Sequence, residues 1–393
     1  MENRTGLFAN GIIWFGVAIS VSEIEAGIQI GSMSAPNSFW IPLILGHILG
    51  GILLFFVGLI GARVRLNAME TTKSTFGKYG SKFFAALNVL QLIAWVAVLN
   101  AQGALALAGL DLPISFPVTC IILAALIGLW VYIGIKRFSK VTTIVMTILT
   151  LLLAVLSVKL LGFNTPMTSA IVGNSKLLSF WNIFELSIAM PISWLPVISD
   201  YTKDVEKPVK ATMVSAIAYT IASLWMYFIG VEIAGIGANY NIAQAILLTG
   251  LGIPGILIVV FSTVTSNFVA ANSGGESAKA IYNKINPKTA GVIISGLSAV
   301  LAISGIMNHY IGFLYLIASV FAPMAAVLVV SFYLDKKQDE DAKTWYWNMF
   351  AWFAGFLVYQ VTVSMDSVFL GPTLLAIIVS AVLAYIRVLV KNR

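Results

Sequence analysis

Long apolar stretches, each close to the length of a membrane-crossing helix, recur along the whole chain. A bilayer core of about 30 Å needs roughly 20 apolar residues per helical crossing. Twelve such stretches occur, at 9–32, 38–62, 83–108, 114–135, 139–161, 178–199, 211–235, 252–273, 289–306, 310–333, 345–364 and 369–390. A membrane β-barrel would show shorter segments of alternating polarity, whereas a run such as ILTLLLAVL at 148–156 does not alternate. The pattern predicts an all-α integral membrane protein with twelve transmembrane helices.

Composition supports this prediction and excludes several classes of protein. Of 393 residues, 59% are hydrophobic and 10% are charged, whereas an ordinary soluble domain is about 25% charged. The first stretch has no signal-peptide cleavage site, so we expect it to be retained. One cysteine and two histidines, Cys120, His47 and His309, exclude a disulfide framework and a multi-histidine metal site. The chain has no phosphate-binding loop and no basic block rich in aromatics, so we expect no ATP-driven pump, no cofactor, no nucleic-acid partner and no obligate protein partner.

Charge predicts the orientation, because cytoplasmic loops carry an excess of Lys and Arg. With twelve spans and a cytoplasmic N-terminus, 21 of the 23 Lys and Arg residues fall on the cytoplasmic side, and only Lys159 and Lys176 fall outside. An incorrect number of spans would scramble this asymmetry. We therefore expect a multi-pass protein of the cytoplasmic membrane with both termini in the cytoplasm, and the lipid bilayer as its surroundings.

Three spans carry polar or helix-breaking residues, which are costly in hydrocarbon. The first contains Glu23 and Glu25, which lie about 200° apart on a regular helix and can share one cavity only if the backbone opens. The sixth contains Pro191 and Pro196, each of which removes a helix donor. In the eighth, residues 262–272 include six polar but uncharged side chains. Hydroxyl and amide oxygens of this kind suit a hard cation or a polar ligand.

Interrupted helices in matching positions of two halves are typical of secondary transporters. The first and sixth spans match if residues 1–161 form one repeat of five helices, residues 162–333 form a second, and residues 334–393 add two more helices. Because five is odd, the second repeat would be inverted in the membrane. The third span places Trp95 close to Gln91 near mid-membrane, and a buried indole offers a flat face for stacking a planar ring.

Three motifs resemble those of the nucleobase:cation symporter-1 family, which carries cytosine, allantoin, hydantoins and related rings. They are STFGKYGS at 74–81, QLIAW at 91–95 and PVISDYT at 196–202. The segments SEIEAG at 22–27 and MPISWLPVISDYTK at 190–203 look most like the subgroup assigned as hydroxymethylpyrimidine (thiamine-precursor) permeases of the CytX type. The resemblance implies the LeuT-type fold, in which two inverted repeats of five helices surround a site at mid-membrane.

The resemblance also implies the roles of individual residues. Trp95 would stack on the substrate ring, and a second stacking position would fall near Met190 and Pro191. Neither of these is aromatic, so Trp194 could substitute. The substrate-contacting residues implied are Ser20, Glu23, Gln91, Trp95, Met190, Pro191, Trp194, Asn267 and Asn272. A sodium site would use the carbonyl oxygens of Gly16 and Ile19 with oxygens of Ser262, Thr265 and Ser266.

The carboxylates of the first span lead to a hypothesis about substrate recognition. An aminopyrimidine presents a ring nitrogen and an exocyclic amine side by side, and a carboxyl group can pair with both. Glu23 is the first candidate because Gly16, Ser20 and Glu23 fall on one helical stripe. The sequence does not decide whether Glu23 or Glu25 faces the site.

We therefore expect a secondary active symporter that brings a small planar pyrimidine, hydroxymethylpyrimidine-like or cytosine-like, into the cytoplasm by alternating access. The polar eighth span favours Na⁺ as the coupling ion, whereas the first-span carboxylates would also serve H⁺. The first alternative is an amino acid or amine symporter of the same fold. A membrane-embedded enzyme is a more distant alternative, because it would need convergent acid and base groups or a metal site.

Overall fold

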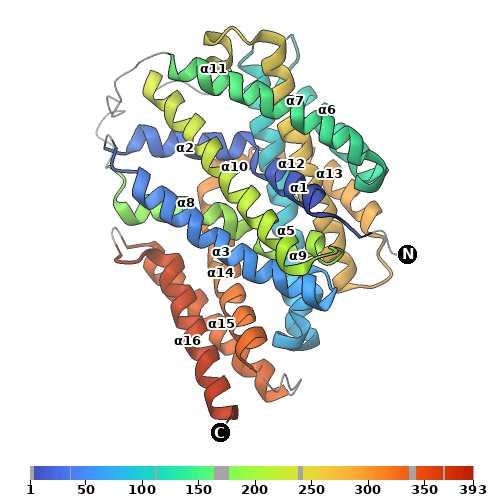
Figure 1. Ribbon diagram of the computed structural model, residues 1–393, viewed down its shortest axis with the longest axis vertical. Helices are drawn as coiled ribbons and strands as arrows, with labels where there is room; N and C mark the ends of the chain where they lie inside the picture. The colour runs from blue at the N-terminus through green and yellow to red at the C-terminus, as the bar shows by residue number, and fades with distance from the viewer. Residues whose placement is uncertain are drawn as a thin grey trace.

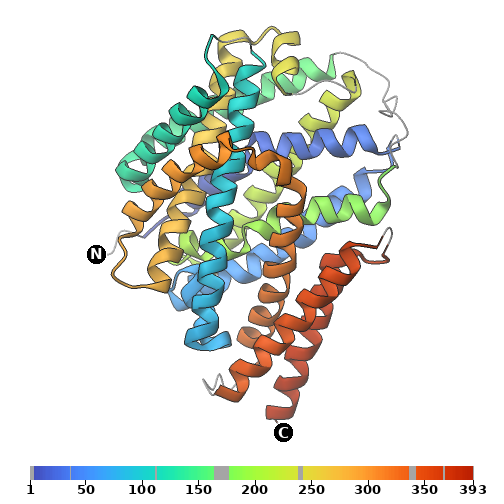
Figure 2. The same cartoon turned by 180° about the vertical axis from the view of Figure 1, so that it is seen from behind.

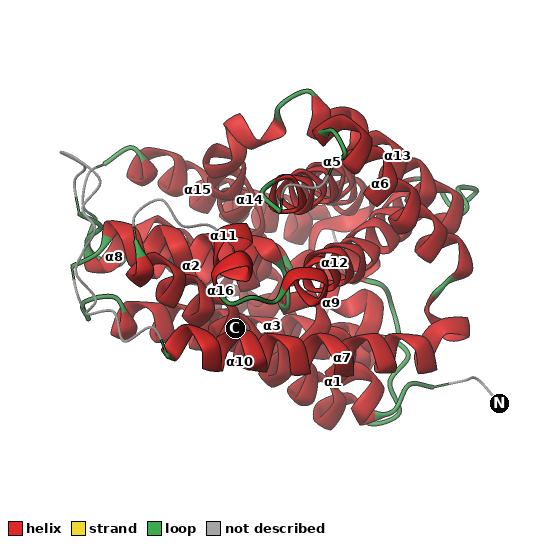
Figure 3. Ribbon diagram, turned by 90° about the horizontal axis from the view of Figure 1, so that it is seen from above, coloured by secondary structure: helices red, strands yellow, loops and turns green. Residues whose placement is uncertain are grey.

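The computed structural model describes residues 4–35, 37–110, 113–162, 177–237, 242–335, 342–365 and 368–392. Its regular structure there is helical apart from one isolated bridge between Thr5 and Val205, and Figure 3 shows helices joined by loops. The elements are α1 (Leu7–Ala18), α2 (Val21–Met33), α3 (Trp40–Val64), α4 (Ala68–Thr71), α5 (Lys73–Ala108), α6 (Phe116–Ile133), α7 (Ile135–Leu161), α8 (Phe180–Ser193), α9 (Leu195–Thr202), α10 (Pro208–Ile236), α11 (Ile242–Leu248), α12 (Gly252–Ile281), α13 (Pro287–Ile303), η1 (Ile306–His309), α14 (Tyr310–Leu334), α15 (Ala342–Val363) and α16 (Gly371–Asn392).

Each of the twelve predicted spans coincides with a helix or a pair of helices, and the all-α membrane fold is confirmed. Among the described residues, nine helical segments are long and apolar enough to cross a membrane, or ten if the bent pair α1 and α2 counts as one span. The remaining two predicted spans correspond to α13, a shorter apolar helix, and α15. The inverted relation of the two repeats and their boundaries stay predictions. Lys176, which the charge count places outside, lies beyond the described residues.

The first span is broken between α1 and α2, which meet at an angle of 50°. Ser20 has extended backbone geometry, and its hydroxyl accepts a hydrogen bond from the Glu23 amide at 3.2 Å. The side chain therefore caps α2, which is the usual role of serine at this position. The break therefore falls at Ile19 and Ser20, between Gly16 and Gly27.

The sixth span is also divided into two helices, α8 and α9. Trp194 alone separates α8 from α9, and its backbone remains in the right-handed helical region, with φ −98° and ψ −5°. Pro191 lies inside α8, and Pro196 lies in the first turn of α9, where a missing amide hydrogen has no cost. The sixth span is thus divided at Trp194, but its backbone there stays helical, whereas the first span loses helical geometry at Ile19 and Ser20.

Two helices extend further than their apolar stretches predict. α5 begins at Lys73, ten residues before its predicted span, and α12 continues to Ile281. The start of α5 turns at Gly77, whose φ of 70° suits glycine. A Cβ there would also lie 2.6 Å from the Trp345 ring. Tertiary contacts thus stabilise helical turns that hydropathy assigns to loops.

The helices form two closely packed sets. The first helix group contains α1, α2, α3, α8, α9 and α10. The second helix group contains α5, α6, α12 and α13. Contacts between the groups are fewer and include α1 with α12 and α2 with α5. In Figure 2 the long helix α5 runs through the second group, and Figure 1 shows α15 and α16 projecting at one end of the molecule.

Within the first helix group, α2 and α10 touch along their backbones. A Cβ on Gly27 would overlap the carbonyl oxygen of Tyr227, and a Cβ on Gly230 would overlap the carbonyl oxygen of Ile24. Small residues permit this close approach, as is common between membrane helices. The two helices are therefore held at a fixed separation.

Segments that the charge pattern places in the cytoplasm lie next to one another. The Thr5 amide donates to the carbonyl oxygen of Asp204 at 2.9 Å, and the Arg65 guanidinium donates to the carbonyl oxygen of Lys203, also at 2.9 Å. The N-terminus, the α3–α4 connection and the α9–α10 connection thus meet at one end of the molecule. This arrangement is consistent with the predicted orientation.

Candidate functional site

The eighth span meets the break in the first span through one hydroxyl group. The Ser266 hydroxyl oxygen on α12 lies 3.4 Å from the carbonyl oxygen of Gly16, 3.2 Å from that of Val17 and 3.2 Å from that of Ile19. A hydroxyl has one proton and can satisfy only one of these three acceptors. Gly16 and Val17 belong to the last turn of α1 and Ile19 caps it, so the carbonyls lie at the negative end of the helix dipole. Such an oxygen cluster fits a cation.

Three of the five residues implied for a sodium site, Gly16, Ile19 and Ser266, are brought together in this cluster. The hydroxyls of the other two bond to carbonyls of their own helix: Ser262 donates to Val259 at 3.1 Å, and Thr265 donates to Phe261 at 2.7 Å. Hydroxyls in membrane helices often bond in this way. Val17 is an additional neighbour that the sequence did not suggest.

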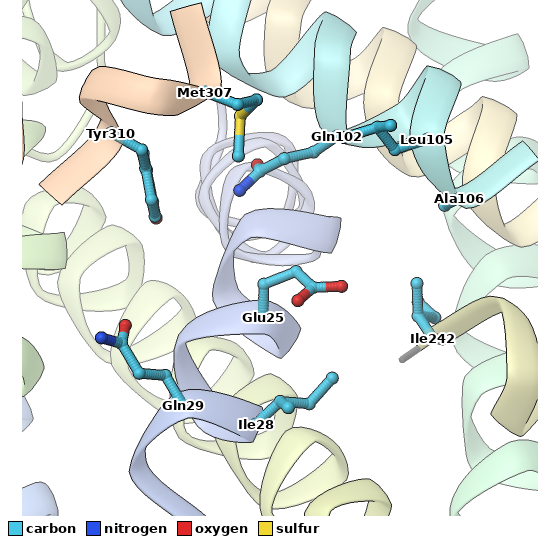
Figure 4. Close-up of a pocket in the computed structure, with 9 residues that line it drawn as sticks. All are labelled: Glu25, Ile28, Gln29, Gln102, Leu105, Ala106, Ile242, Met307 and Tyr310. Atoms are coloured by element: carbon cyan, nitrogen blue, oxygen red, sulfur yellow. The ribbon is translucent and has the colours of Figure 1, made fainter. Parts of the chain in front are cut away.

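A cavity of about 470 Å³ lies between α2, α5, α11, η1 and α14. Its lining is made by Glu25, Ile28, Gln29, Gln102, Leu105, Ala106, Ile242, Met307 and Tyr310. Figure 4 shows the Glu25 side chain in the middle of this space, with Gln102 above it and Tyr310 to one side. Glu25 is the one charged residue among the lining residues that the structure describes. The cavity therefore presents one carboxylate and two amides to a ligand.

Tyr310 connects the cavity to Trp95. Its ring lies edge-on to the Trp95 ring, with the ring centres 6.4 Å apart, and its hydroxyl lies 3.0 Å from the Ser22 hydroxyl on α2. Phe313, one turn further along α14, is also edge-on to Trp95 at 5.5 Å. Trp95 is 3% exposed. In this structure it is covered by α14 and is reached from the cavity through Tyr310.

Several predicted substrate residues have buried polar atoms without a hydrogen-bond partner among the described residues. These atoms are the side-chain oxygen of Gln91, the indole nitrogen of Trp95 and both amide atoms of Asn267. Gln91 uses only its amide nitrogen, which donates to Asn88 at 2.7 Å. Leaving a buried polar group unpaired costs about 1–3 kcal/mol. Concentration of such atoms on α5 and α12 is typical of a site that binds a polar molecule.

Glu23 and Glu25 point in different directions from α2. The carboxylate of Glu23 accepts hydrogen bonds from the Tyr219 hydroxyl at 2.9 Å and from the Ser223 hydroxyl at 2.8 Å, both on α10. Glu25 faces the cavity instead. The pairing of Glu23 with a substrate stays untested, and in this structure α10 engages both of its oxygens.

The remaining predicted residues are dispersed. Met190 belongs to the same buried apolar cluster as Trp95. Pro191 packs against Gly50 of α3, and the Trp194 ring lies edge-on to Trp14 at 6.2 Å. Asn272, five residues beyond the unpartnered Asn267 on α12, donates to the Tyr201 hydroxyl at 3.2 Å.

The opposite end of α5 is closed by contacts between the two helix groups. Asn88 of α5 donates to the carbonyl oxygen of Pro196 at 2.9 Å, and Lys203 pairs with Glu276 of α12 at 3.2 Å. Burial lowers the pKa of Lys203, but the nearby carboxylates of Glu276 and Asp200 outweigh it, and the pKa is raised above its usual value. At about 1.5 Å per residue, Asn88 and Gln102 lie about 20 Å apart along α5. The cavity thus lies toward one end of α5, and these contacts between the groups lie toward the other.

Sequence reasoning did not identify Tyr310, Gln29 and Met307 as cavity residues. Tyr310 reads as an ordinary interfacial aromatic at the start of a span, and its contacts with Trp95 and Ser22 join residues more than 200 positions apart in the chain. One signal was available for the break in the first span. Ser20 and Glu23 have the spacing of a capping box, which marks the start of a new helix at residue 21.

The sequence is similar to those of known membrane permeases. A family model described as a permease for cytosine/purines, uracil, thiamine and allantoin matches residues 2–384. The cytosine permease of Escherichia coli (strain K12) is 21% identical over 347 residues, which cover 87% of this chain and 81% of the relative. The hydantoin permease of Microbacterium maritypicum is 24% identical over 429 aligned positions, covering 98% of this chain and 86% of the relative.

The fold has a counterpart among solved structures. MHP1, a nucleobase-cation-symport-1 family transporter, matches in its inward-facing conformation with a TM-score of 0.77 and 19% sequence identity, covering 99% of this chain and 91% of that chain. In a closed conformation with bromovinylhydantoin bound, it matches with a TM-score of 0.72.

Proposed function

The chain belongs to the family of permeases for cytosine/purines, uracil, thiamine and allantoin, and from this premise we propose that it carries a small planar pyrimidine into the cytoplasm together with a cation. The protein is a multi-pass membrane transporter. Its relatives are permeases and not enzymes, so the membrane-enzyme alternative is set aside. The substrate, the ion and the direction of transport are the content of the proposal.

The observation that carries the proposal is the position of Tyr310. Its ring lines the cavity that contains Glu25 and also touches the ring of Trp95. A planar ring entering the cavity would meet a carboxylate and two amides first, and would reach Trp95 once the Tyr310 ring moves aside. Stacking on an indole and pairing with a carboxyl group together favour an aminopyrimidine.

We assign the pairing role to Glu25, because its side chain points into the cavity whereas that of Glu23 is held by α10. The exocyclic amine would donate to one carboxylate oxygen, and the adjacent ring nitrogen would pair with the other when protonated. For the opposite edge of the ring, Asn267 supplies an unpartnered amide and Gln91 supplies an unpartnered side-chain oxygen. Trp95 supplies one stacking face, with Met190 beside it as an apolar contact.

The oxygen cluster around Ser266 supports Na⁺ as the coupling ion. Unwound backbone carbonyls at broken helices bind Na⁺ in secondary transporters. The cluster lies between α1 of the first helix group and α12 of the second, so a bound cation would favour the arrangement in which the groups meet there. A ligand shifts a conformational equilibrium only by its differential affinity for the two states.

The test is ligand-induced thermal stabilisation of the purified protein, in Na⁺ and in K⁺ buffer. The panel is hydroxymethylpyrimidine, cytosine, uracil, hydantoin, thiamine and several amino acids. Binding to the folded state raises the melting temperature with ln(1 + [L]/Kd). We expect an aminopyrimidine to stabilise the protein in Na⁺ buffer, to do so less in K⁺ buffer, and to lose its effect in Trp95→Leu.

Trp347→Leu is the matched control. Trp347 lies on α15, is 39% exposed and donates to the carbonyl oxygen of Leu383, far along the chain from the proposed site. The control should keep the ligand effect. Stabilisation by amino acids alone would contradict the pyrimidine proposal and favour the amine symporter of the same fold.

A further inference from the structure

Four buried side chains form a continuous hydrogen-bonded line through the first helix group. Glu23 of α2, which is 2% exposed, accepts a hydrogen bond from Ser223 of α10 at 2.8 Å. The Nε2 atom of His47 on α3 lies 2.7 Å from the same Ser223 hydroxyl. The Nδ1 atom of His47 lies 2.7 Å from the Ser187 hydroxyl on α8. The line therefore joins four helices of one group.

In the part of the chain that the structure describes, no buried basic group other than His47 lies beside the Glu23 carboxyl to balance its charge. Among the described residues, the other buried acidic or basic side chains are Glu185, Asp200, Asp335 and Arg387. Glu185 bonds to α15 and α16, Asp200 caps α4, and Asp335 pairs with Arg387. The titratable groups around the line are the tyrosines Tyr219, Tyr227 and Tyr310, which carry no charge near neutral pH. His47 is thus the one group able to compensate the carboxylate of Glu23.

Two distributions of protons along Glu23, Ser223 and His47 fit the same positions of the heavy atoms. In the first, Ser223 donates to an ionised Glu23 and accepts from a proton on Nε2 of His47. In the second, a protonated Glu23 donates to Ser223, which turns its own proton to a bare Nε2. In both, Nδ1 can keep its proton, because the carbonyl oxygen of Leu43 lies 3.1 Å away. The arrangements differ only in the positions of two protons.

We propose that Glu23, Ser223 and His47 form a binding site for one proton, shared between the carboxyl and the imidazole through the serine hydroxyl. Transfer moves the Nε2 proton to the Ser223 oxygen and the Ser223 proton to the Glu23 oxygen. The imidazolium and carboxylate pair thereby becomes a neutral imidazole and a neutral carboxylic acid. No other reactant takes part, and total charge stays at zero.

The proton is required for a neutral interior. Without it the line carries one net negative charge, and with a second proton it carries one net positive charge. Burying an uncompensated charge is strongly unfavourable. The packing of α2, α3, α8 and α10 should therefore be most stable over the pH range in which the site holds one proton. This inference goes beyond the proposed function and does not depend on the transported molecule.

The composition of the chain makes a direct test possible. His47 and His309 are the two histidines, and His309 is exposed, so His309→Gln leaves one imidazole to observe. In that background, ¹⁵N NMR counts the protons on the His47 ring at pH 7. The infrared carboxyl band that disappears in Glu23→Gln reports whether Glu23 is protonated.

Two results support the site: a doubly protonated His47 ring beside an ionised Glu23, or a singly protonated ring beside a protonated Glu23. A singly protonated ring beside an ionised Glu23 would overturn it, because the shared proton would then be absent.

A stability measurement provides an independent readout. His47→Gln should lower the melting temperature above neutral pH, because Glu23 is left without a compensating group. The double variant Glu23→Gln/His47→Gln should melt higher than His47→Gln and should lose the pH dependence, because glutamine keeps hydrogen-bonding atoms without charge. A double variant that melts below both single variants at every pH would refute the proposal.

Discussion

The hydroxyl oxygen of Ser266 lies 3.2 Å from the carbonyl oxygen of Ile19, at the residue where the first span loses its helical geometry. The eighth span therefore contacts the first at its break, and the contact joins the two helix groups. The position of this contact between the two helix groups suits an ion that is bound in one conformation and released in another.

Ser266→Ala should weaken sodium binding. Removing one oxygen ligand from a small cluster costs roughly 1.5 kcal/mol, the strength of a hydrogen bond to a charged group, so the Na⁺ concentration for half-maximal stabilisation should rise about tenfold. The measurement is a sodium titration of the melting temperature. Ser262→Ala is the control, because the Ser262 hydroxyl bonds to Val259 and its carbonyl is unchanged. If Ser266→Ala and Ser262→Ala changed the sodium titration equally, the Ser266 hydroxyl would not be a sodium ligand.

Glu25→Gln should change which pyrimidines bind. The amide keeps one acceptor but loses the charge, so an aminopyrimidine should lose about tenfold or more in affinity. Uracil lacks the exocyclic amine, and any binding of uracil should change little. Competition with a radiolabelled ligand gives both constants. Unchanged affinity for the aminopyrimidine would show that Glu25 is not its partner.

Asn267→Ala and Asn272→Ala should separate binding from stability. Both amide atoms of Asn267 are buried and unpartnered among the described residues, so its loss should leave the melting temperature nearly unchanged and weaken ligand binding about tenfold. Asn272 donates to Tyr201, so Asn272→Ala should cost about 1 kcal/mol of stability. Melting curves with and without ligand test both. If Asn267→Ala instead lowered stability and Asn272→Ala instead weakened binding, Asn272 would be the ligand contact and Asn267 the structural residue.

Glu276→Gln should open the closed end of the molecule. The Lys203–Glu276 pair is about one-fifth exposed on each side, and a pair of this kind is worth about 0–1 kcal/mol, enough to shift a balanced equilibrium up to about fivefold. Ser273 is buried near this end, so Ser273→Cys in a Cys120→Ser background reports access to a thiol reagent. Labelling should become faster in Glu276→Gln. No change in rate would mean that other contacts keep this end closed.

Gly230→Ala should strongly destabilise the protein, whereas Gly296→Ala should not. A Cβ at Gly230 would overlap the α2 backbone, but a Cβ at Gly296 meets nothing within 4 Å. Forcing α2 and α10 apart should cost about 2 kcal/mol or more, and Gly296→Ala should gain up to about 1 kcal/mol from helix propensity. Thermal melting distinguishes them. A tolerated Gly230→Ala would show that the two helices can separate easily.

The membrane spans could be predicted because hydrocarbon imposes its length on every apolar helix, and residues such as Ile148–Leu156 read directly as spans. The break at Ser20 was also accessible through its capping spacing with Glu23. The directions of Glu23 and Glu25 were not, because they depend on Tyr219, Ser223 and the α5 wall, which lie 80 to 200 residues away. The spacing of the two carboxylates correctly predicts that they lie on different faces of the helix. It does not predict which residues each face contacts.

At Gly27 and Gly230 the backbones of α2 and α10 lie so close that neither position has room for a Cβ. This contact restricts how the molecule can change shape. Helices whose backbones touch cannot slide past one another without a clash, so α2 and α10 must travel as one body. Any movement between conformational states must therefore occur at the less closely packed interface between the two helix groups, where α1 contacts α12 and α2 contacts α5. The Ser266 oxygen cluster lies at that interface, so a cation bound there would hold the two helix groups together, and its release would let them move apart.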